Sequence, residues 1–319
     1  MNRREFLAAS LAAAPVLAGA PPAFGARRGA LGLATADKQA HVVAVRLAGG
    51  RIVKRIATRE DPRSIEHQGR GPAVVAHSGI GAVSLIDPDR LAVRRVLRGF
   101  QTPRYTAIGH DAEVAYVTDA GSGELAVVDL VRGRVVRRIP VGAGARHVTI
   151  SPDRTTLWIA LGSSASTLVV VDVRSPLHPR VVRHVQPPFL AHDVGFSPSG
   201  RRVWVTAGRD SMLGIYAASG AGRPQLLGAD AAPQHVTFGP TYAYVASGNA
   251  GRVRLYRLSG ARAFITAGVP IGSYNVVRGG GRVLTPSLGA GTLTILNPHG
   301  HVLHEVTVAD AAHDAGVIA

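Results

Sequence analysis

Cysteine is absent from the 319 residues of this sequence. Its absence excludes disulfide bonds, thiolate metal sites and a catalytic thiol, and it also excludes a lipoprotein anchor, which needs a cysteine to carry the lipid. Aromatic residues are scarce too, at 5% of the chain. A basic stripe with interleaved aromatics, on which single-stranded nucleic acids stack, is not visible. We therefore predict no specific nucleic-acid partner.

Sequence motifs of the common enzyme classes are also missing. The chain has no Gly-x-Ser-x-Gly segment, no phosphate-binding loop, no dinucleotide fingerprint and no His-Glu-x-x-His segment. The glycine run over residues 279–281 opens no helix and is expected to be a turn between strands. We accordingly predict no catalytic residue, no cofactor and no committed metal site, and we favour a non-catalytic protein over an enzyme.

The first residues have the pattern of an export signal. Arg3 and Arg4 precede an apolar stretch over residues 7–20, with small residues after it. This order is typical of secretory signals, and the Arg-Arg-x-Phe-Leu core resembles the twin-arginine class, which carries folded proteins across the membrane. We predict an export signal over residues 1–26 and a single mature domain over residues 27–319, located in the periplasm or outside the cell.

The apolar stretch of the signal is shorter than the roughly 20 residues that cross a bilayer. We therefore expect no transmembrane span in the mature chain. Cleavage is compatible with the small residues at 18–20 and at 23–25. An uncleaved membrane anchor is the alternative.

From residue 30 onward, short runs of Val, Ile and Leu alternate with turns of Gly, Ser, Asp and Pro. This pattern predicts many short strands, and no stretch shows helical periodicity over more than a turn or two. The strands form a repeating unit of four, and successive units begin 39 to 46 residues apart. The first strands of the units are expected to begin near Arg63, Arg104, Arg146, His192, Gln234, Tyr274 and His313. A fixed long period of four strands is typical of a propeller blade.

The two ends of the domain set the number of blades. The segment over residues 313–318 is a first strand with nothing after it, and residues 30–35 form a second strand with nothing before it. Together they make one complete blade, and their pairing covers edges that would otherwise be open to aggregation. We predict an all-β, seven-bladed β-propeller with four antiparallel strands per blade, closed by the C-terminal strand joining the N-terminal blade.

Several segments resemble the YVTN-type β-propeller repeat. They are Tyr116–Asp119, Gly121–Asp129, Arg137–Val141, His147–Asp153, Val83–Asp87 and Ser197–Gly200. The resemblance covers essentially residues 30–319 and implies blades, while it says little about a ligand. It permits a lactonase- or lyase-like enzyme that uses a histidine as general acid or base. Asp87, Asp129, Asp172 and Asn297 end the third strands, where a turn-forming role suffices.

Nearly all of the formal charge of +16 comes from arginine, because Lys38 and Lys54 are the only lysines. Many arginines fall on or beside the expected fourth strands: Arg55, Arg94, Arg95, Arg98, Arg137, Arg138, Arg180 and Arg183. Charged side chains on an outer strand discourage edge-to-edge pairing. This placement predicts a basic rim, with weak and salt-sensitive adhesion to anionic polymers or lipid head groups.

The residues that open the first strands should converge at one mouth of the central channel, since the turns before them lie on the same face. The candidate ligand-binding residues are Arg63, Arg104, Arg146, His147, His192, Asp193, His235, Tyr274, His313 and Asp314. His192 and His313 stand in near-copies of one segment, Ala-His-Asp-x-Gly, three blades apart. We expect them to face each other across the channel.

Three functions are compatible with this mouth. The favoured one is a non-catalytic binding or scaffold protein, expected to be a monomer, whose partner is an unknown protein or a small polar or anionic ligand held by the arginines. The second is the lactonase- or lyase-like enzyme. The third is a metal- or haem-associated periplasmic protein, because four histidines at one opening could ligate a transition metal. The simpler alternative to the third function is that the histidines bind no metal, because water and backbone carbonyls in the open mouth satisfy their hydrogen bonds.

Overall fold

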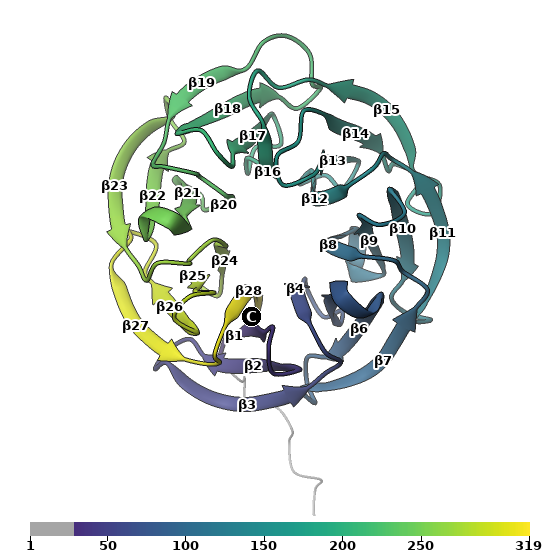
Figure 1. Cartoon of the computed structure of the whole chain (residues 1–319), viewed down its shortest axis with the longest axis vertical. Helices are drawn as coiled ribbons and strands as arrows, with labels where there is room; N and C mark the ends of the chain where they lie inside the picture. Colours follow the sequence, from purple (N-terminus) through teal and green to yellow (C-terminus); the bar gives the residue numbers. More distant parts are fainter. Residues whose placement is uncertain (1–28) are drawn as a thin grey trace, which may run out of the picture.

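The computed structural model describes residues 29–319, which form a ring of seven four-stranded antiparallel sheets (Figure 1). The predicted seven-bladed β-propeller is therefore confirmed. The predicted export signal over residues 1–26 lies outside the described residues. Among the described residues, the helices are three one-turn 3-10 segments: η1 (Ser78–Ile80), η2 (His110–Ala112) and η3 (Gly248–Ala250). No described helix is long and apolar enough to cross a membrane.

Each blade runs from an inner strand at the channel to an outer strand at the rim. The inner strands are β4 (Pro62–Glu66), β8 (Pro103–Ile108), β12 (Ala145–Ile150), β16 (Ala191–Phe196), β20 (His235–Phe238), β24 (Val277–Gly279) and β28 (Ala312–Ile318). The second strands are β1 (Leu31–Ala36), β5 (Ala73–His77), β9 (Val114–Asp119), β13 (Thr156–Leu161), β17 (Arg202–Ala207), β21 (Tyr242–Ser247) and β25 (Arg282–Pro286).

The third strands are β2 (His41–Arg46), β6 (Ala82–Asp87), β10 (Glu124–Asp129), β14 (Leu168–Asp172), β18 (Met212–Ala217), β22 (Arg252–Arg257) and β26 (Thr292–Leu296). The outer strands are β3 (Arg51–Ala57), β7 (Ala92–Arg98), β11 (Arg134–Pro140), β15 (Arg180–Val185), β19 (Gln225–Gly228), β23 (Arg262–Gly268) and β27 (Val302–Thr307). Six inner strands begin within one residue of the predicted positions. The exception is β24, which begins three residues after Tyr274, because Tyr274 still belongs to a turn in which its N–H donates to the carbonyl of Gly272.

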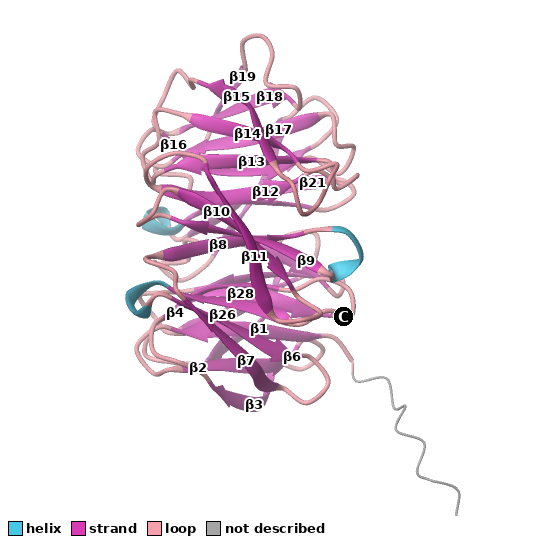
Figure 2. Ribbon diagram, turned by 90° about the vertical axis from the view of Figure 1, so that its right-hand side faces the viewer, coloured by secondary structure: helices cyan, strands magenta, loops and turns pink. Residues whose placement is uncertain are grey.

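The ring closes as the sequence predicts. The last strand, β28, pairs antiparallel with β1, and Leu31 stands opposite Ile318. Because of this pairing, the start of β1 and the end of β28 lie on the same face of the disc (Figure 2). The inner strands begin on the other face, which carries the predicted mouth.

The hydrophobic core lies between the blades. Second and third strands are buried on both of their faces, as in β14, where Leu168 to Val171 are all buried. This arrangement explains why these strands are near-continuous runs of Val, Ile and Leu. Large aromatic side chains fill the wide outer part of the gaps between blades. Trp158 and Tyr216, from neighbouring blades, have ring centroids 5.7 Å apart.

The third strands end in the turns that the sequence predicts. The Oδ1 atom of Asp87 accepts hydrogen bonds from the N–H groups of Asp89 and Arg90. The side chains of Asp129, Asp172 and Asn297 accept equivalent bonds from residues two to four positions further on. These carboxylates and the amide therefore shape turns on the surface.

The arginines predicted on the outer strands do lie there, and several of them also join neighbouring blades. The guanidinium of Arg94 on β7 donates to the carbonyl of Leu130 at 2.6 Å, and Nε of Arg95 donates to that of Gly133 at 2.9 Å. Arg55 on β3 reaches back to the carbonyl of Val308 in the same way. The basic rim thus consists partly of connections between blades.

Candidate functional site

Most predicted mouth residues stand on backbone bulges at the start of inner strands, among them the three successive strands β8, β12 and β16, whereas His235 on β20 is regularly paired. In β12, Ala145 pairs with Leu161 and the next pair is Val148 with Ile159, so that Arg146 and His147 face a single residue of β13. The equivalent bulge in β8 holds residues 104–105, and that in β16 holds residues 192–193. A bulge re-aims side chains away from the regular pleat. The bulges therefore turn residues at equivalent positions toward the channel.

Threonines on the second strands hold the starts of the inner strands of the next blade. The hydroxyl of Thr118 on β9 donates to the carbonyl of Arg146, and that of Thr206 on β17 donates to the carbonyl of Gln234 at 2.6 Å. The backbone that carries the mouth side chains is therefore held from the neighbouring blade. Such support fixes the site before any ligand arrives.

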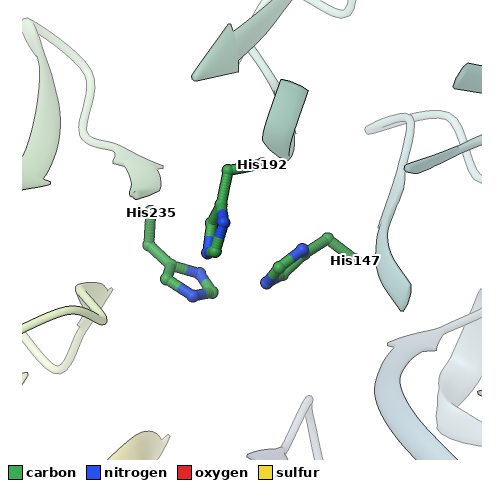
Figure 3. A group of neighbouring side chains, drawn as sticks. All are labelled: His147, His192 and His235. Atoms are coloured by element: carbon green, nitrogen blue, oxygen red, sulfur yellow. The ribbon is translucent and has the colours of Figure 1, made fainter. Parts of the chain in front are cut away.

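Three of the four predicted mouth histidines come together. One ring nitrogen from each of His147 on β12, His192 on β16 and His235 on β20 lies within 4.8 Å of the others. The ring centroid of His147 lies 4.5 Å from that of His192 and 4.8 Å from that of His235. Figure 3 shows the three rings pointing toward one another from three consecutive blades.

Two of the three rings are oriented by a second group. Nδ1 of His192 lies 2.9 Å from the carbonyl oxygen of Ser163, to which it can only donate. Nδ1 of His235 lies 3.4 Å from Oδ2 of Asp193. Both contacts engage Nδ1, so that Nε2 is the nitrogen that can accept a hydrogen bond or bind a metal ion. A carbonyl or carboxylate on the far side of the ring is the usual arrangement for histidines that bind metals.

The third ring has no such partner. His147 is 1% exposed, and neither of its ring nitrogens makes a hydrogen bond of normal geometry among the described residues, although the backbone of His192 lies close enough to act on its pKa. A buried polar group without a partner costs about 1–3 kcal/mol. The cost makes His147 a candidate for a role other than folding.

Burial lowers the pKa of His147 well below its usual value, and the neighbouring His192 and His235 lower it further. Burial, followed by His235, also lowers the pKa of His192 to about 4. These two rings are therefore neutral near pH 7. The neutral imidazole is the form that binds a metal ion.

Tyr105 on β8 completes the cluster from a fourth consecutive blade. Its ring centroid lies 4.2 Å from that of His147, and its hydroxyl lies 3.5 Å from Nε2 of His235. Beneath the cluster, the channel contains a cavity of about 460 Å³ that Tyr105, Asp193 and His235 help to line. The cluster is therefore continuous with an open channel.

The remaining predicted residues do not join the three histidines. Nδ1 of His313 lies 2.7 Å from the carbonyl oxygen of Arg63, on the opposite side of the channel from β16. Burial, then the charge of Arg63, lowers the pKa of His313 well below its usual value. Tyr274 lies apart from the histidines as well, and its hydroxyl donates to Oδ1 of Asn249 at 3.1 Å.

The predicted arginines lie beside the histidines, and β12 carries a member of each group. The arginines come from β4, β8 and β12, and one of them, Arg63, forms an ion pair of 2.9 Å with Asp37. Asp314 accepts the N–H of Ile65 and lies beneath the mouth, where burial raises its pKa to about 6. The mouth thus holds a histidine group and an arginine group that meet at β12.

Two partners of the histidines are not among the predicted ligand-binding residues. Tyr105 occupies the same bulge position as His147, and that equivalence is a usable signal. Ser163 lies in the turn after β13 and contributes a backbone carbonyl, which no residue type reveals. A hydrogen-bonded Ser84–His77 pair also exists at 2.8 Å, but both side chains are 0% exposed and cannot reach a substrate.

No protein-family model and no curated protein matches the sequence. Solved structures with the same architecture do match. A functionally unknown protein from Desulfotomaculum acetoxidans is 13% identical, with a TM-score of 0.78 over 90% of this chain and 98% of that chain. Kuenenia stuttgartiensis hydrazine synthase is 17% identical, with a TM-score of 0.66 over 79% of this chain and 88% of that one.

The dihydro-heme d1 dehydrogenase NirN, solved in complex with DHE, is also similar. It is 17% identical, with a TM-score of 0.65 over 91% of this chain and 66% of that chain. At these identities the likenesses show the propeller fold alone. The function must be argued from the mouth of this chain.

Proposed function

We propose that this chain is an exported binding protein that holds one divalent transition-metal ion between His147, His192 and His235. The single observation that carries the proposal is the buried ring of His147, whose two nitrogens make no hydrogen bond of normal geometry and which points at two other imidazoles. Three imidazoles are a ligand set suited to Zn²⁺, Cu²⁺ or Ni²⁺. The proposal joins the binding role favoured from the sequence with the metal alternative.

The distances between the histidine nitrogens fit a metal site whose side chains move slightly closer together when the ion binds. Metal–nitrogen bonds of about 2.0–2.1 Å place the ligating nitrogens of a tetrahedral site roughly 3.3 Å apart. The ligating atoms lie within 4.8 Å of one another, so small rotations of the side chains suffice. Three protein ligands leave a fourth position, and the hydroxyl of Tyr105 is close enough to His235 to reach it or to bond a metal-bound water.

The proposal includes export of the protein and its membership of the YVTN-type repeat family. The twin-arginine-like pattern at residues 1–26 supports export to the periplasm or beyond, and a folded cargo suits a preformed metal site. The YVTN-type repeat supports a blade-based binding surface. Replacing Arg3 and Arg4 by lysine should retain the protein in the cytoplasm, as cell fractionation would show; an unchanged distribution argues against this route.

Calorimetric titration of chelator-treated protein with Zn²⁺ and with Cu²⁺ tests the metal site. We expect one saturable site, and a loss of at least 100-fold in affinity on His147→Ala and on His192→Ala. His184→Ala, an exposed histidine of the outer strand β15, is the matched control and should bind like the wild type. Equal affinity in all three variants would exclude the site.

Two further measurements separate the competing functions. Metal analysis of protein from its native compartment should find about one equivalent of a transition metal, and less in His192→Ala. Hydrolysis of a lactone panel by the metal-free protein, abolished by the same substitution, would instead favour the enzyme. A specific partner recovered equally by the wild type and by His147→Ala would favour a scaffold that does not use the histidines.

A further inference from the structure

Three arginines occupy the start of three consecutive inner strands, beside the histidines. They are Arg63 on β4, Arg104 on β8 and Arg146 on β12, and each of the three side chains is partly buried. Arg63 pairs with Asp37. Among the described residues, the guanidinium groups of Arg104 and Arg146 have neither an ion pair nor a hydrogen bond to a protein acceptor.

The three arginines stand at equivalent positions of consecutive blades, close enough for their charges to act on one another. Burial, followed by the charges of Arg146 and Arg63, lowers the pKa of Arg104. The Arg146 guanidinium carbon lies 5.8 Å from the ring centroid of Tyr105, which is the residue after Arg104. The Nε atoms of all three arginines are buried and have no partner. Among the described residues, only Arg63 of the three forms an ion pair with a carboxylate.

The carboxylates around this cluster are already engaged. Asp61, whose charge acts on Arg104, accepts the N–H of Gly79 at 2.6 Å. Asp193 and Asp314 accept backbone N–H groups of neighbouring inner strands at 3.0 and 2.9 Å. The arginine group of the mouth therefore carries an excess of positive charge with donors that no protein group uses.

We propose that the mouth binds a small oxyanion between the guanidinium groups of Arg104 and Arg146, with Arg63 as a third cation. The planar guanidinium fork matches two oxygens of a phosphate-, sulfate- or carboxylate-type group, and two forks at one place select an anion with several acceptor oxygens. The site is independent of the proposed metal ion, although Arg146 and His147 are adjacent and both ligands can occupy one mouth.

The experiment uses the mature protein in excess EDTA, titrated calorimetrically with inorganic phosphate, with sulfate and with succinate. We expect one saturable site for at least one of these probes. Arg104→Gln and Arg146→Gln should each weaken it at least tenfold. Arg183→Gln on the exposed outer strand β15 removes the same charge and should change the affinity less than twofold. The ranking of the three probes distinguishes an inorganic anion from a carboxylate.

Arg104→Lys keeps the charge but loses the fork, and it should still weaken binding severalfold. Unfolding curves of each variant verify that the ring remains folded. No saturable binding of any probe, or an equal loss in Arg183→Gln, overturns the proposal. Binding that appears with Zn²⁺ but not in EDTA also overturns it, because the anion would then be a ligand of the metal, while the metal site itself would stand.

Discussion

Asp193 links two blades through Val236, whose backbone N–H donates to Oδ2 of the carboxylate at 3.0 Å. Asp314 makes the same link at 2.9 Å to the N–H of Ile65. In both copies of the Ala-His-Asp-x-Gly segment, the aspartate thus connects neighbouring inner strands, β16 with β20 and β28 with β4. One copy does more, because Asp193 also lies 3.4 Å from Nδ1 of His235.

The two aspartates therefore form a matched pair for mutation. Asp193→Ala and Asp314→Ala should each reduce the free energy of unfolding by about 1–3 kcal/mol, because each leaves a buried N–H without an acceptor. Asp193→Ala alone should also weaken Zn²⁺ binding by about 10–100-fold, the usual effect of removing a carboxylate behind a metal-binding histidine. Urea unfolding and calorimetry measure the two effects. An equal loss of metal affinity in both variants would refute the role of Asp193.

His147 should destabilise the protein when no metal is bound. Its buried imidazole has two nitrogens without a hydrogen bond of normal geometry, and an apolar residue of similar volume removes that cost. In EDTA, His147→Leu should raise the free energy of unfolding by about 1 kcal/mol, measured by urea unfolding. His192→Leu is the control, since Nδ1 of His192 is bonded to Ser163, and it should show no gain. A larger loss in His147→Leu than in His192→Leu would contradict this account.

The architecture could be predicted because the same strand patterns and turn residues recur along the sequence at a regular spacing. Turn residues such as Asp87, the buried runs of the second and third strands, and the split seventh blade all follow from periodicity and strand chemistry. The grouping of the mouth side chains could not be predicted in the same way. His192 and His313 have the same neighbours in sequence, but their strands, β16 and β28, lie on opposite sides of the channel (Figure 1). Which rings meet depends on adjacency around the ring, and this favours His147, His192 and His235 on consecutive blades.

The start of β24 shows a second limit of sequence reasoning. The repeat predicts a strand from Tyr274, but the turn at Gly272, with φ +91°, delays the ladder until Val277. Tyr274 consequently bonds Asn249 instead of facing the histidines. A period of about forty residues fixes the order of the strands, whereas hydrogen bonds in the turns decide where each strand begins.

Glu66 gives the protein a dependence of stability on pH. The side chain lines the channel, and burial, followed by the charge of Asp314, raises its pKa from the usual 4.5 to about 8. A raised pKa in the folded state means that the unfolded state loses its proton first, so stability falls as the pH rises from about 4.5 to about 8. Glu66→Gln should remove this loss.

We expect the midpoint of thermal unfolding of Glu66→Gln to exceed that of the wild type by about 2 °C or more at pH 9, since about 1 kcal/mol shifts a domain of this size by a few degrees. At pH 4.5 the two proteins should unfold together. The comparison at each pH cancels the titration of Asp37, whose pKa is raised to about 7 by burial and on which Glu66 does not act. A constant difference at both pH values would exclude Glu66 as the titrating group.

The arginines of β7 offer a test of the connections between blades. Arg94 and Arg95 donate to carbonyls of the next blade, whereas Arg98, on the same strand, has no hydrogen bond among the described residues. Replacing Arg94 and Arg95 together by alanine should reduce the free energy of unfolding by about 1 kcal/mol, discounted for their exposure. Arg98→Ala should change it by less than about 0.5 kcal/mol. Similar losses in both proteins, measured by urea unfolding, would mean that the arginines act only through their charge.

The pairing of β28 with β1 should decide whether the ring folds at all. Deleting residues 311–319 removes the inner strand of the closing blade and uncovers β1, whose six residues are all buried in the intact ring. The exposed ladder edge and apolar face should leave the chain unfolded or aggregating. Deleting Ala319 alone, which lies beyond β28, is the control and should preserve a cooperative transition. Circular dichroism and size-exclusion chromatography report the outcome, and a synthetic peptide of residues 311–319 should partly restore the fold by supplying the missing strand. A truncated protein that stays monomeric and unfolds at the wild-type temperature would show that the blade holds without its closing strand.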